Sequence, residues 1–242
     1  MLISIITINY NNLTGLKKTV ESVLSQSYKS VEYIIIDGGS TDGSKEFIES
    51  NVDKIDYYVS EPDKGVYHAM NKGLAFANGN YCIFMNSGDI FYDNDVIHNF
   101  INLCKGEDLI YGLAIWSHTN MYWNPPRGIR LRDTINKVLI PHQATFYKLS
   151  KIKQIGGYNE NYKIVSDWIM FVDFIIQGFS YNKIDLVVCL SEPAGLSLTN
   201  ISIIKSEQIF YLKQKKYKYL IGYFYFSFVD RLKRFFKKIF RK

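Results

Sequence analysis

Short apolar runs alternate with stretches of helical periodicity over the first 85 residues. Four runs, rich in Ile, Val and Tyr and without regular polar alternation, have the composition of strands covered on both faces; they span residues 2–8, 31–36, 55–59 and 81–85. Helix-type patterns lie between them, at residues 14–24, 44–50 and 66–77. In the first of these, Thr14 is a candidate cap for a helix with one apolar stripe: Leu16, Val20, Val23 and Leu24. This order predicts βαβ crossovers and a parallel sheet.

Beyond residue 89, strand-like and helix-like segments alternate less regularly. A helix is expected to begin at Asp93 or Asp95, and strands are expected over 109–116, 141–146 and 181–190. Ser166 is a candidate cap for a further helix that ends near Gly178. We therefore expect an α/β fold with a mainly parallel, twisted sheet flanked by helices. One domain is expected over residues 1–204, with halves at 1–90 and 91–204, followed by a separate tail at 205–242.

Polar segments follow the first four predicted strands, and those after the second, third and fourth contain carboxylates. Asp37 ends the second run, Asp63 lies just beyond the third, and Asn86-Ser87-Gly88-Asp89 follows the fourth. Crossover connections bring the carboxyl ends of such strands to one edge of the sheet, where ligands bind in open α/β folds. Asp89 is therefore the leading candidate for holding a divalent cation against a nucleotide diphosphate. The alternative for each of these segments is an ordinary turn formed by Asn, Asp and Gly.

Charge separates the tail from the rest of the chain. Residues 205–242 contain 12 Lys or Arg and two acidic residues, which gives +10, whereas residues 1–204 carry −4. Within the tail, apolar side chains recur at helical spacing among basic ones, in the pattern of a helix lying in a membrane interface: Leu232, Phe235, Phe236, Ile239 and Phe240. A helix packed on the protein's own core or on a partner subunit is the alternative. Nucleic-acid binding is disfavoured because the domain itself is acidic.

Cysteine content and hydropathy narrow the class of protein further. The three cysteines, Cys82, Cys104 and Cys189, are far apart and form no CxxC pair, which argues against a disulfide framework or a zinc site and fits a reducing compartment. The first apolar run begins at residue 2 without a basic leader, so we expect no signal peptide. No stretch reaches the roughly 20 uncharged apolar residues of a membrane-spanning helix.

Five segments, taken in order, resemble the inverting family-2 glycosyltransferases, which have the GT-A fold. The segments are Ser4-Ile5-Ile6-Thr7-Ile8-Asn9-Tyr10-Asn11, Ile36-Asp37-Gly38-Gly39-Ser40-Thr41-Asp42-Gly43, Glu61-Pro62-Asp63-Lys64-Gly65 with Ala69-Met70-Asn71-Lys72-Gly73, the turn at 86–89, and Gly156-Gly157-Tyr158 followed by Ser166-Asp167-Trp168. The resemblance covers about residues 2–198 and is greatest to the small, non-processive members that build bacterial surface polysaccharides.

The resemblance implies roles for particular residues. Thr7, Asn9 and Asp37 would frame the base and ribose, and Asp63 and Asn86 would lie against the nucleotide. Asp89 would coordinate Mg²⁺ or Mn²⁺ on the diphosphate. Asp167 would be the catalytic base that deprotonates the acceptor hydroxyl.

Two departures from the family pattern bear on these roles. The first aspartate of the DxD motif is Asn86 here, which leaves one metal carboxylate and permits metal-independent catalysis. The acidic pair at the base position is Ser166-Asp167, with only the second acid kept. Outside the family pattern, Asp167 would be read as a first-turn acid that favours the helix dipole. His142, after Pro141, could line the acceptor pocket or assist the metal, but a lone histidine is more often structural, so we leave it outside the predicted site residues.

The expected function is the transfer of a single sugar from a nucleotide-sugar donor, expected to be UDP-linked, to a saccharide or lipid-linked saccharide, with inversion of configuration. We expect the enzyme to be cytoplasmic and peripheral on the inner face of the bacterial cell membrane, held there by its tail. The alternative from another class is a non-catalytic subunit that keeps the fold and binds nucleotide sugars. Asn86 and Ser166 are the features that favour this alternative.

Overall fold

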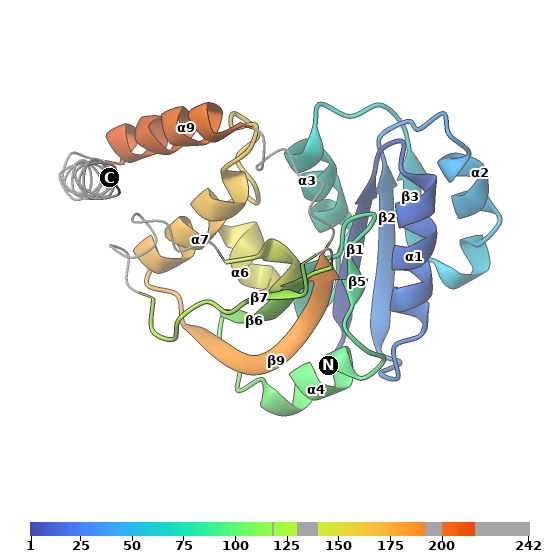
Figure 1. The fold of residues 1–242 in the computed structure, drawn as a ribbon, viewed down its shortest axis with the longest axis horizontal. Helices are drawn as coiled ribbons and strands as arrows, with labels where there is room; N and C mark the ends of the chain where they lie inside the picture. Colours follow the sequence, from blue (N-terminus) through green and yellow to red (C-terminus); the bar gives the residue numbers. More distant parts are fainter. Residues whose placement is uncertain (118, 130–139, 192–199, 216–242) are drawn as a thin grey trace, which may run out of the picture.

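The structure, a computed structural model, describes residues 1–117, 119–129, 140–191 and 200–215 (Figure 1). The strands are β1 (Ile3–Asn9), β2 (Val31–Asp37), β3 (Tyr57–Ser60), β4 (Tyr81–Phe84), β5 (Ile90–Phe91), β6 (Leu109–Trp116), β7 (Met121–Trp123), β8 (Thr145–Lys148) and β9 (Tyr181–Ser191). The helices are α1 (Leu13–Leu24), α2 (Ser44–Glu49), α3 (Val66–Phe76), α4 (Val96–Leu103), α6 (Leu149–Gln154), α7 (Ser166–Ile176) and α9 (Ile201–Gln214), with short 3₁₀ helices η1 (Val52–Lys54) and η2 (His142–Ala144).

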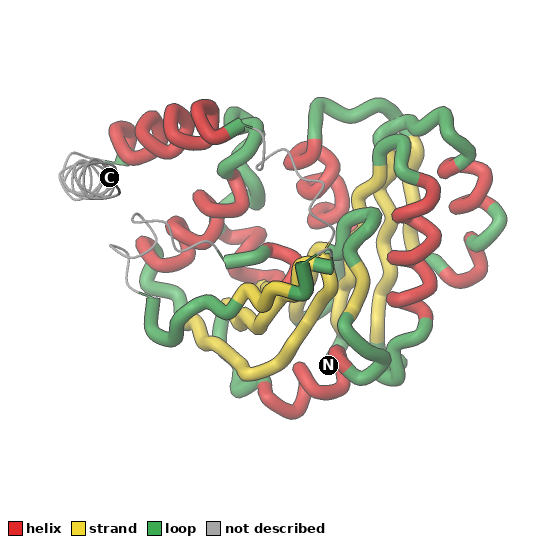
Figure 2. Tube along the Cα trace, in the orientation of Figure 1, coloured by secondary structure: helices red, strands yellow, loops and turns green. Residues whose placement is uncertain are grey.

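All the strands form one twisted sheet with the order β3-β2-β1-β4-β8-β6-β9-β5, and β7 pairs with β6. The first four strands are parallel to one another, with β1 in the centre between β2 and β4. Beyond them, β8 runs antiparallel to both β4 and β6, while β9 is parallel to β6. The sheet is therefore parallel in the half predicted from residues 1–85 and mixed in the other half, where β9 curls across the molecule (Figures 1 and 2).

Helices cover both faces of the sheet, and each face has its own apolar core. On one face α1 and α4 pack on the sheet through residues such as Leu16, Val20 and Phe100. On the other face α3, α6 and α7 contribute residues such as Met70 and Phe174. Burial on both faces explains why the strands lack polar alternation.

Strand β1 shows how the two faces alternate. Ile3 and Ile5 belong to the core under α1, whereas Ile6 and Ile8 belong to the core under α3. Successive side chains of a strand point to opposite faces, so Thr7 lies on the α1 side. Its hydroxyl contacts the Tyr33 hydroxyl at 3.1 Å in the buried interior.

Several element ends differ from the sequence-based expectations. Asn12, not Thr14, caps α1, because its Oδ1 accepts a hydrogen bond from the Gly15 amide at 3.0 Å. Ser166 is the first residue of α7 rather than its cap, since its buried hydroxyl accepts from the Asn159 amide at 2.7 Å. Residues 141–146, expected as a strand, begin instead with η2, and only Thr145 onward joins the sheet as β8.

Helix α9 lies beside α7 and crosses the boundary that we expected between residues 204 and 205. Its Tyr211 is 2% exposed and forms an edge-to-face pair with Trp168 of α7, with ring centroids 5.7 Å apart. The part of the tail that we expected to form a basic amphipathic helix, with its apolar residues between Leu232 and Phe240, lies outside the described residues. Among the residues that the structure does describe, no helix has both the length and the apolarity needed to span a bilayer.

Candidate functional site

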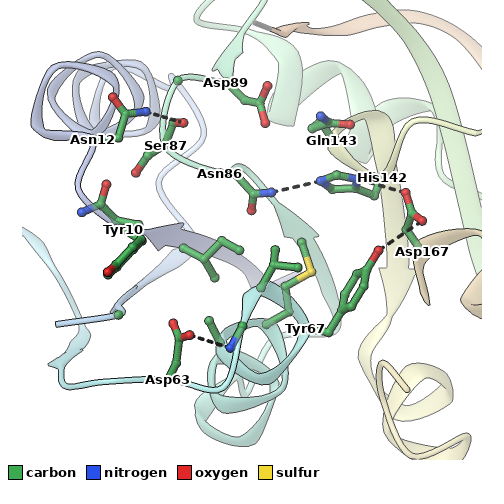
Figure 3. A pocket seen from close by; sticks show the side chains of 18 of the residues that line it. Tyr10, Asn12, Asp63, Tyr67, Asn86, Ser87, Asp89, His142, Gln143 and Asp167 are labelled. Carbon is green, nitrogen blue, oxygen red and sulfur yellow. Dashed lines mark hydrogen bonds and ion pairs between the residues drawn. The ribbon is translucent and has the colours of Figure 1, made fainter. Parts of the chain in front are cut away.

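A cleft of about 740 Å³ opens at the carboxyl ends of the parallel strands. This volume is within the range of small-molecule sites, which is roughly 300–1,000 Å³. The polar residues that line it come from the ends of β1, β3, β4 and β9, from η2 and from the starts of α3 and α7; they include Asn9, Tyr10, Asn12, Asp63, Tyr67, Asn86, Ser87, Asp89, His142, Gln143, Asp167 and Ser191. Figure 3 shows most of these side chains around one space.

The turn that follows β4 forms one end of the cleft. The Asp89 amide donates to the Asn86 carbonyl at 2.9 Å, and Gly88 has a φ of 105°, a conformation that favours glycine. Helix α1 holds the turn from behind, because the Thr19 hydroxyl contacts the Gly88 amide at 3.0 Å and the Asp89 carbonyl at 2.8 Å. The turn therefore has a defined shape before any ligand binds.

Asp89 lies at this end of the cleft and is only 6% exposed. Its Oδ1 accepts a hydrogen bond from the Ser191 hydroxyl at 2.6 Å, and Ser191 ends β9. Two neighbouring acceptors, Asn86 Oδ1 and Ser87 Oγ, are buried without a hydrogen-bond partner among the described residues. A buried polar atom without a partner costs free energy, so these atoms suit a bound polar ligand.

Asp63 enters the cleft over the glycines that follow β2. A Cβ on Gly38 would lie 2.6 Å from Asp63 Oδ2, and a Cβ on Gly39 would lie 3.0 Å from the Pro62 nitrogen. Larger residues at these positions would displace the segment that carries Asp63. The Asp63 carboxylate also accepts from the Gly65 amide at 2.7 Å, just before α3 begins. The segment with Gly38 and Gly39 therefore packs closely against the segment with Pro62 and Asp63 at one wall of the cleft.

Thr7 and Asp37 do not line the cleft, in contrast to Asn9, Asp63, Asn86, Asp89 and Asp167. Asp37 is fully buried, and its two carboxylate oxygens accept four hydrogen bonds, from the side chains of Asn9, Ser40 and Ser60 and from the Ser40 amide. Burial favours the neutral acid, but these hydrogen bonds outweigh it and lower the pKa of Asp37. Within the protein, Asp37 joins the loops after β1, β2 and β3.

Replacing Asp37 with Asn should lower the free energy of unfolding by about 1–3 kcal/mol at neutral pH, because an amide cannot accept all four hydrogen bonds. The folded-state pKa of Asp37 is depressed, so its contribution to stability is present above the unfolded value of about 3.9 and is lost as the pH falls through the folded pKa. Urea unfolding at pH 7 and in acid should therefore show the difference shrinking in acid. Asp53→Asn, at an exposed site in η1, is the matched control. A difference that does not change with pH would contradict this assignment.

Asp167 lies at the other end of the cleft, in the first turn of α7, with 29% of its side chain exposed. Its Oδ1 accepts from the Trp168 amide at 2.7 Å, and its Oδ2 lies 3.6 Å from Nδ1 of His142. The Tyr67 hydroxyl lies 3.5 Å from Oδ1 and donates to the Ile164 carbonyl at 2.6 Å. Burial, with a further effect of the negative Asp167, raises the pKa of Tyr67 well above its ordinary value, so the phenol stays neutral.

The loop before α7 is tied to α3. The side chain of Asn71 donates to the Tyr158 carbonyl and accepts from the Tyr158 amide, both at 2.8 Å. Gly157 has a φ of 74°, and a Cβ there would lie 2.5 Å from Asn71 Oδ1. These contacts join two motifs that are far apart in the sequence, at 69–73 and 156–158, and so link the two halves of the protein beneath the cleft.

Glu207 of α9 holds the segment that leads into α7. Its carboxylate accepts hydrogen bonds from the amides of Lys163, Ile164 and Val165 at 2.7, 3.1 and 3.2 Å. These amides precede a helix N-terminus, where the helix dipole also favours a negative charge. Since Lys163 and Ile164 line the cleft, α9 supports one of its walls from outside.

Glu207→Ala should lower the free energy of unfolding by about 1–3 kcal/mol, because three backbone amides lose their acceptor. Glu207→Gln, which keeps one acceptor oxygen, should lose less. Chemical denaturation measures both, with Glu21→Ala on the exposed side of α1 as the control, expected within about 0.5 kcal/mol of the wild type. Equal stability of Glu207→Ala and the control would refute this role of Glu207.

Among the described residues, no group of three or more His, Cys, Asp or Glu side chains has the geometry to hold a metal ion. Asp89 is the carboxylate at the turn after β4, beside the buried acceptors Asn86 Oδ1 and Ser87 Oγ. One carboxylate suffices for a Mg²⁺-type ion when phosphates and water supply the other ligands. These residues therefore fit a cation that arrives with a diphosphate, and do not form a complete protein-built metal site.

Several residues of the cleft were not predicted as site residues. His142 and Gln143 lie between the two ends of the cleft, and Tyr67, Trp116 and Ser191 complete its walls. The sequence held one signal: Pro141-His142-Gln143 is a polar segment directly before a β-rich one. Ser191 could not be recognised, because only the curl of β9 brings it beside Asp89.

Comparison with known sequences identifies relatives over most of the chain. The model of glycosyl transferase family 2 matches residues 4–176. An uncharacterised glycosyltransferase of Mycobacterium tuberculosis is 35% identical over 171 residues, which are 68% of this chain and 65% of that protein. A PGL/p-HBAD biosynthesis glycosyltransferase of Mycobacterium bovis is 32% identical over 183 residues, 73% of this chain and 69% of that protein. The chain therefore spans about two thirds of the length of these relatives.

Solved structures share the fold at low sequence identity. The fragment 1–349 of TarS from S. aureus, in complex with UDP, aligns with a TM-score of 0.68 at 16% identity, over 86% of this chain and 65% of the fragment. The mannosyltransferase PcManGT from Pyrobaculum calidifontis aligns with a TM-score of 0.61 at 16% identity, over 78% of this chain and 56% of that one. These alignments confirm the expected GT-A fold. Together with the sequence match over residues 4–176, they show that the chain belongs to glycosyl transferase family 2.

Proposed function

We propose that this protein transfers a single sugar from a UDP-linked donor to a saccharide or lipid-linked saccharide acceptor, with inversion at the anomeric carbon. The observation that carries the proposal is that Asp89 and Asp167 line one cleft from separate elements, the turn after β4 and the start of α7. A single displacement needs the leaving diphosphate and the base on opposite sides of the sugar. Figure 3 supports this with Asp89 and Asp167 set apart in the cleft and His142 between them.

The donor is proposed to lie along the wall formed by Asn9, Asp63 and Asn86, with its diphosphate toward Asp89. The ligands of the aligned structures support a nucleotide donor: TarS fragments were solved with UDP and with UDP-GlcNAc, and PcManGT with GDP-Man and Mn²⁺. Thr7 and Asp37 would act on this site indirectly, because they lie beneath it and Asp37 fixes the loops that form its wall.

A bound Mg²⁺ or Mn²⁺ would neutralise the negative charge that develops on the leaving diphosphate. Asp89 would hold it, in keeping with the single carboxylate at that turn. Catalysis without a metal is the second candidate, and Asn86 in place of a carboxylate is the observation that favours it. Under either candidate, the turn at 86–89 lies at the diphosphate.

Asp167 is proposed as the general base. The acceptor hydroxyl attacks the anomeric carbon as the bond to the diphosphate breaks, and its proton passes to the Asp167 carboxylate. Proton transfer to a positioned carboxylate contributes roughly 10²–10⁴-fold to the rate. Asp167 is partly exposed at the cleft, so it is accessible to an acceptor while its Oδ1 is held by the Trp168 amide.

A thermal-shift panel tests the donor assignment. UDP, UDP-sugars, GDP-sugars and CDP would each be added with Mn²⁺, with Mg²⁺ and with EDTA. Binding to the folded state at 100 times the Kd raises its stability by about 2.7 kcal/mol. A shift confined to UDP compounds is the expected result. No shift with any nucleotide would contradict the proposal, and binding without turnover of any acceptor would favour the non-catalytic alternative.

The tail is proposed to hold the protein on the inner face of the bacterial cell membrane, where a lipid-linked acceptor is met. The support is its sequence: residues 205–242 carry a net charge of +10, and apolar residues recur at helical spacing. Each Lys or Arg near an anionic surface adds about 1 kcal/mol of attraction.

Deletion of residues 217–242 should abolish sedimentation with vesicles of phosphatidylglycerol and phosphatidylcholine, because it removes eight of the 12 basic side chains and the apolar stripe. A variant with Gln in place of Arg231, Lys233, Arg234, Lys237 and Lys238 should bind weakly and lose its preference for the anionic lipid. Continued sedimentation of the deletion variant would exclude the tail as the anchor.

A further inference from the structure

The short helix η2 bridges the two ends of the cleft. On one side, Nε2 of His142 lies 3.1 Å from Nδ2 of Asn86, at the start of the turn that carries Asp89. On the other side, Nδ1 of His142 lies 3.6 Å from Oδ2 of Asp167. The ring is largely buried, with 17% of the side chain exposed. One imidazole therefore contacts both the donor end and the carboxylate that we assign as the base (Figure 3).

These two contacts define a tautomer. The Nδ2 of Asn86 can only donate a hydrogen bond, so Nε2 of His142 must accept it and carries no hydrogen. The hydrogen of the neutral ring is then on Nδ1, which faces the Asp167 carboxylate. The opposite tautomer would set two donors against each other at Asn86 and a lone pair against a negative oxygen at Asp167.

The backbone around His142 is held in place on both sides. The Pro141 carbonyl accepts from the Thr145 hydroxyl at 2.8 Å and from the Ala144 amide at 3.0 Å. The next side chain, Gln143, donates to the Ser191 hydroxyl at 3.2 Å, and Ser191 in turn donates to Asp89. Asp89 is thus connected to η2 through the hydrogen bonds of Ser191 and Gln143, and Asp167 through its 3.6 Å contact with His142.

We propose that His142 is a positioning residue that orients Asp167 through Nδ1–H, and that the Asn86 amide selects the tautomer that makes this possible. The assignment of Asp167 as the base rests on the proposed function, whereas the tautomer does not. A distance of 3.6 Å is long for a hydrogen bond, and such contacts often shorten when substrate binds. Asn86 would serve both ends of the cleft: Nδ2 toward His142, and the unpartnered Oδ1 toward a group of the donor.

This role makes a carboxylate at position 86 unsuitable. An aspartate there has no hydrogen to donate at neutral pH, so it would draw the imidazole hydrogen to Nε2 or favour a charged ring. The first change removes the hydrogen that faces Asp167, and the second charges the ring, so the neutral Nδ1–H form is lost in both. This chain has Asn86 where the family motif usually has its first aspartate. The amide of Asn86 is the partner that Nε2 of His142 needs.

A set of variants at position 142 tests the role in turnover. In His142→Asn the amide takes roughly the place of Nδ1–H and can still donate to Asp167, whereas in His142→Gln it takes the place of Nε2 and meets Asn86 instead. His142→Ala should lower kcat for transfer by about 10²-fold, in line with the cost of misplacing a catalytic group. His142→Asn should restore part of this loss and His142→Gln little of it. KM for the donor and the thermal shift with UDP should not change.

A second measurement reads the tautomer without any activity. The imidazole ¹⁵N shifts of ¹⁵N-histidine-labelled protein would be recorded at a pH above the range in which histidine titrates. The spectrum of His142→Asn identifies the signals of His142 among the four histidines. We expect an Nδ1–H ring in the wild type and its loss in Asn86→Asp.

The possible outcomes distinguish failure of the positioning role of His142 from failure of the proposed transferase function. Wild-type kcat in His142→Ala, or equal loss in His142→Asn and His142→Ala, would overturn the positioning role, as would an Nε2–H signal in the wild type. Loss of UDP binding in His142→Ala would show a donor-binding role instead and would overturn it too. An Nδ1–H signal in a protein that transfers no sugar would leave the tautomer intact and refute the proposed function.

Discussion

Asp167→Asn is expected to lower the rate of sugar transfer by about 10²–10⁴-fold, because an amide of the same shape cannot take the proton of the acceptor hydroxyl. The substitution preserves an acceptor at Oδ1 for the Trp168 amide, so the start of α7 should remain folded. Initial rates at saturating donor measure the effect. Binding of UDP should be unchanged, because Asp167 lies at the end of the cleft away from Asp89.

Asp173→Asn is the matched control for this experiment. Asp173 is on the same helix, and its carboxylate contacts Tyr211 of α9 rather than the cleft. The control should transfer sugar at nearly the wild-type rate. If Asp167→Asn were as active as Asp173→Asn, Asp167 could not be the base, and the family's usual arrangement would not apply to this chain.

Asp89→Asn should lower kcat/KM by about 10²–10³-fold and weaken the effect of Mn²⁺ on nucleotide binding. The reason is that a metal supplies several kcal/mol of charge stabilisation at a leaving group, and each 1.36 kcal/mol is a factor of ten in rate. EDTA should impose a similar loss on the wild type and little further loss on the variant, since both remove the same ion. Transfer assays with and without EDTA measure both effects.

Asp93→Asn, in the exposed segment after β5, is the control for the loss of a nearby charge. It should behave like the wild type with and without EDTA. Turnover of the wild type that does not change in EDTA would remove the metal from the mechanism. In that event Asp89 would be left with its hydrogen bond to Ser191 as a structural role.

The parallel half of the fold was predictable because its signals are local. Four apolar runs and the helical patterns between them correspond to β1–β4 and α1–α3, with ends that differ by one or two residues. Right-handed crossovers place the carboxyl ends of these parallel strands at one edge of the sheet. Asp63, Asn86 and Asp89 follow those ends, so they meet at that edge. The position of the cleft therefore follows from the order of elements.

The exclusion of Thr7 and Asp37 from the cleft follows from the contacts that bury them. Asn9 lies on the same face of β1 as Thr7 and still lines the cleft, so the face of the sheet does not decide which residues reach it. Thr7 contacts the buried Tyr33 hydroxyl, and Asp37 is enclosed by the side chains of Asn9, Ser40 and Ser60. The sequence indicated the correct strand ends, but these contacts between separate strands and loops have no local pattern.

The acceptor half depends on contacts between distant segments. The η2 turn, the antiparallel insertion of β8 between β4 and β6, and the curl of β9 have no local pattern that distinguishes them from other short β-rich segments. His142 gains its significance from Asn86 and Asp167, which are 56 and 25 residues away in the sequence. The contacts of His142 with these two residues form only when the strands have assembled into the sheet.

The most direct test of the central claim is a crystal structure of this protein with UDP and Mn²⁺. We expect one nucleotide in the cleft at the carboxyl ends of β1–β4, with its diphosphate at Asp89 and its nucleoside along Asp63. Open space between the phosphates and Asp167 should remain for a sugar and an acceptor. A nucleotide bound at another surface, or phosphates in contact with Asp167, would contradict it.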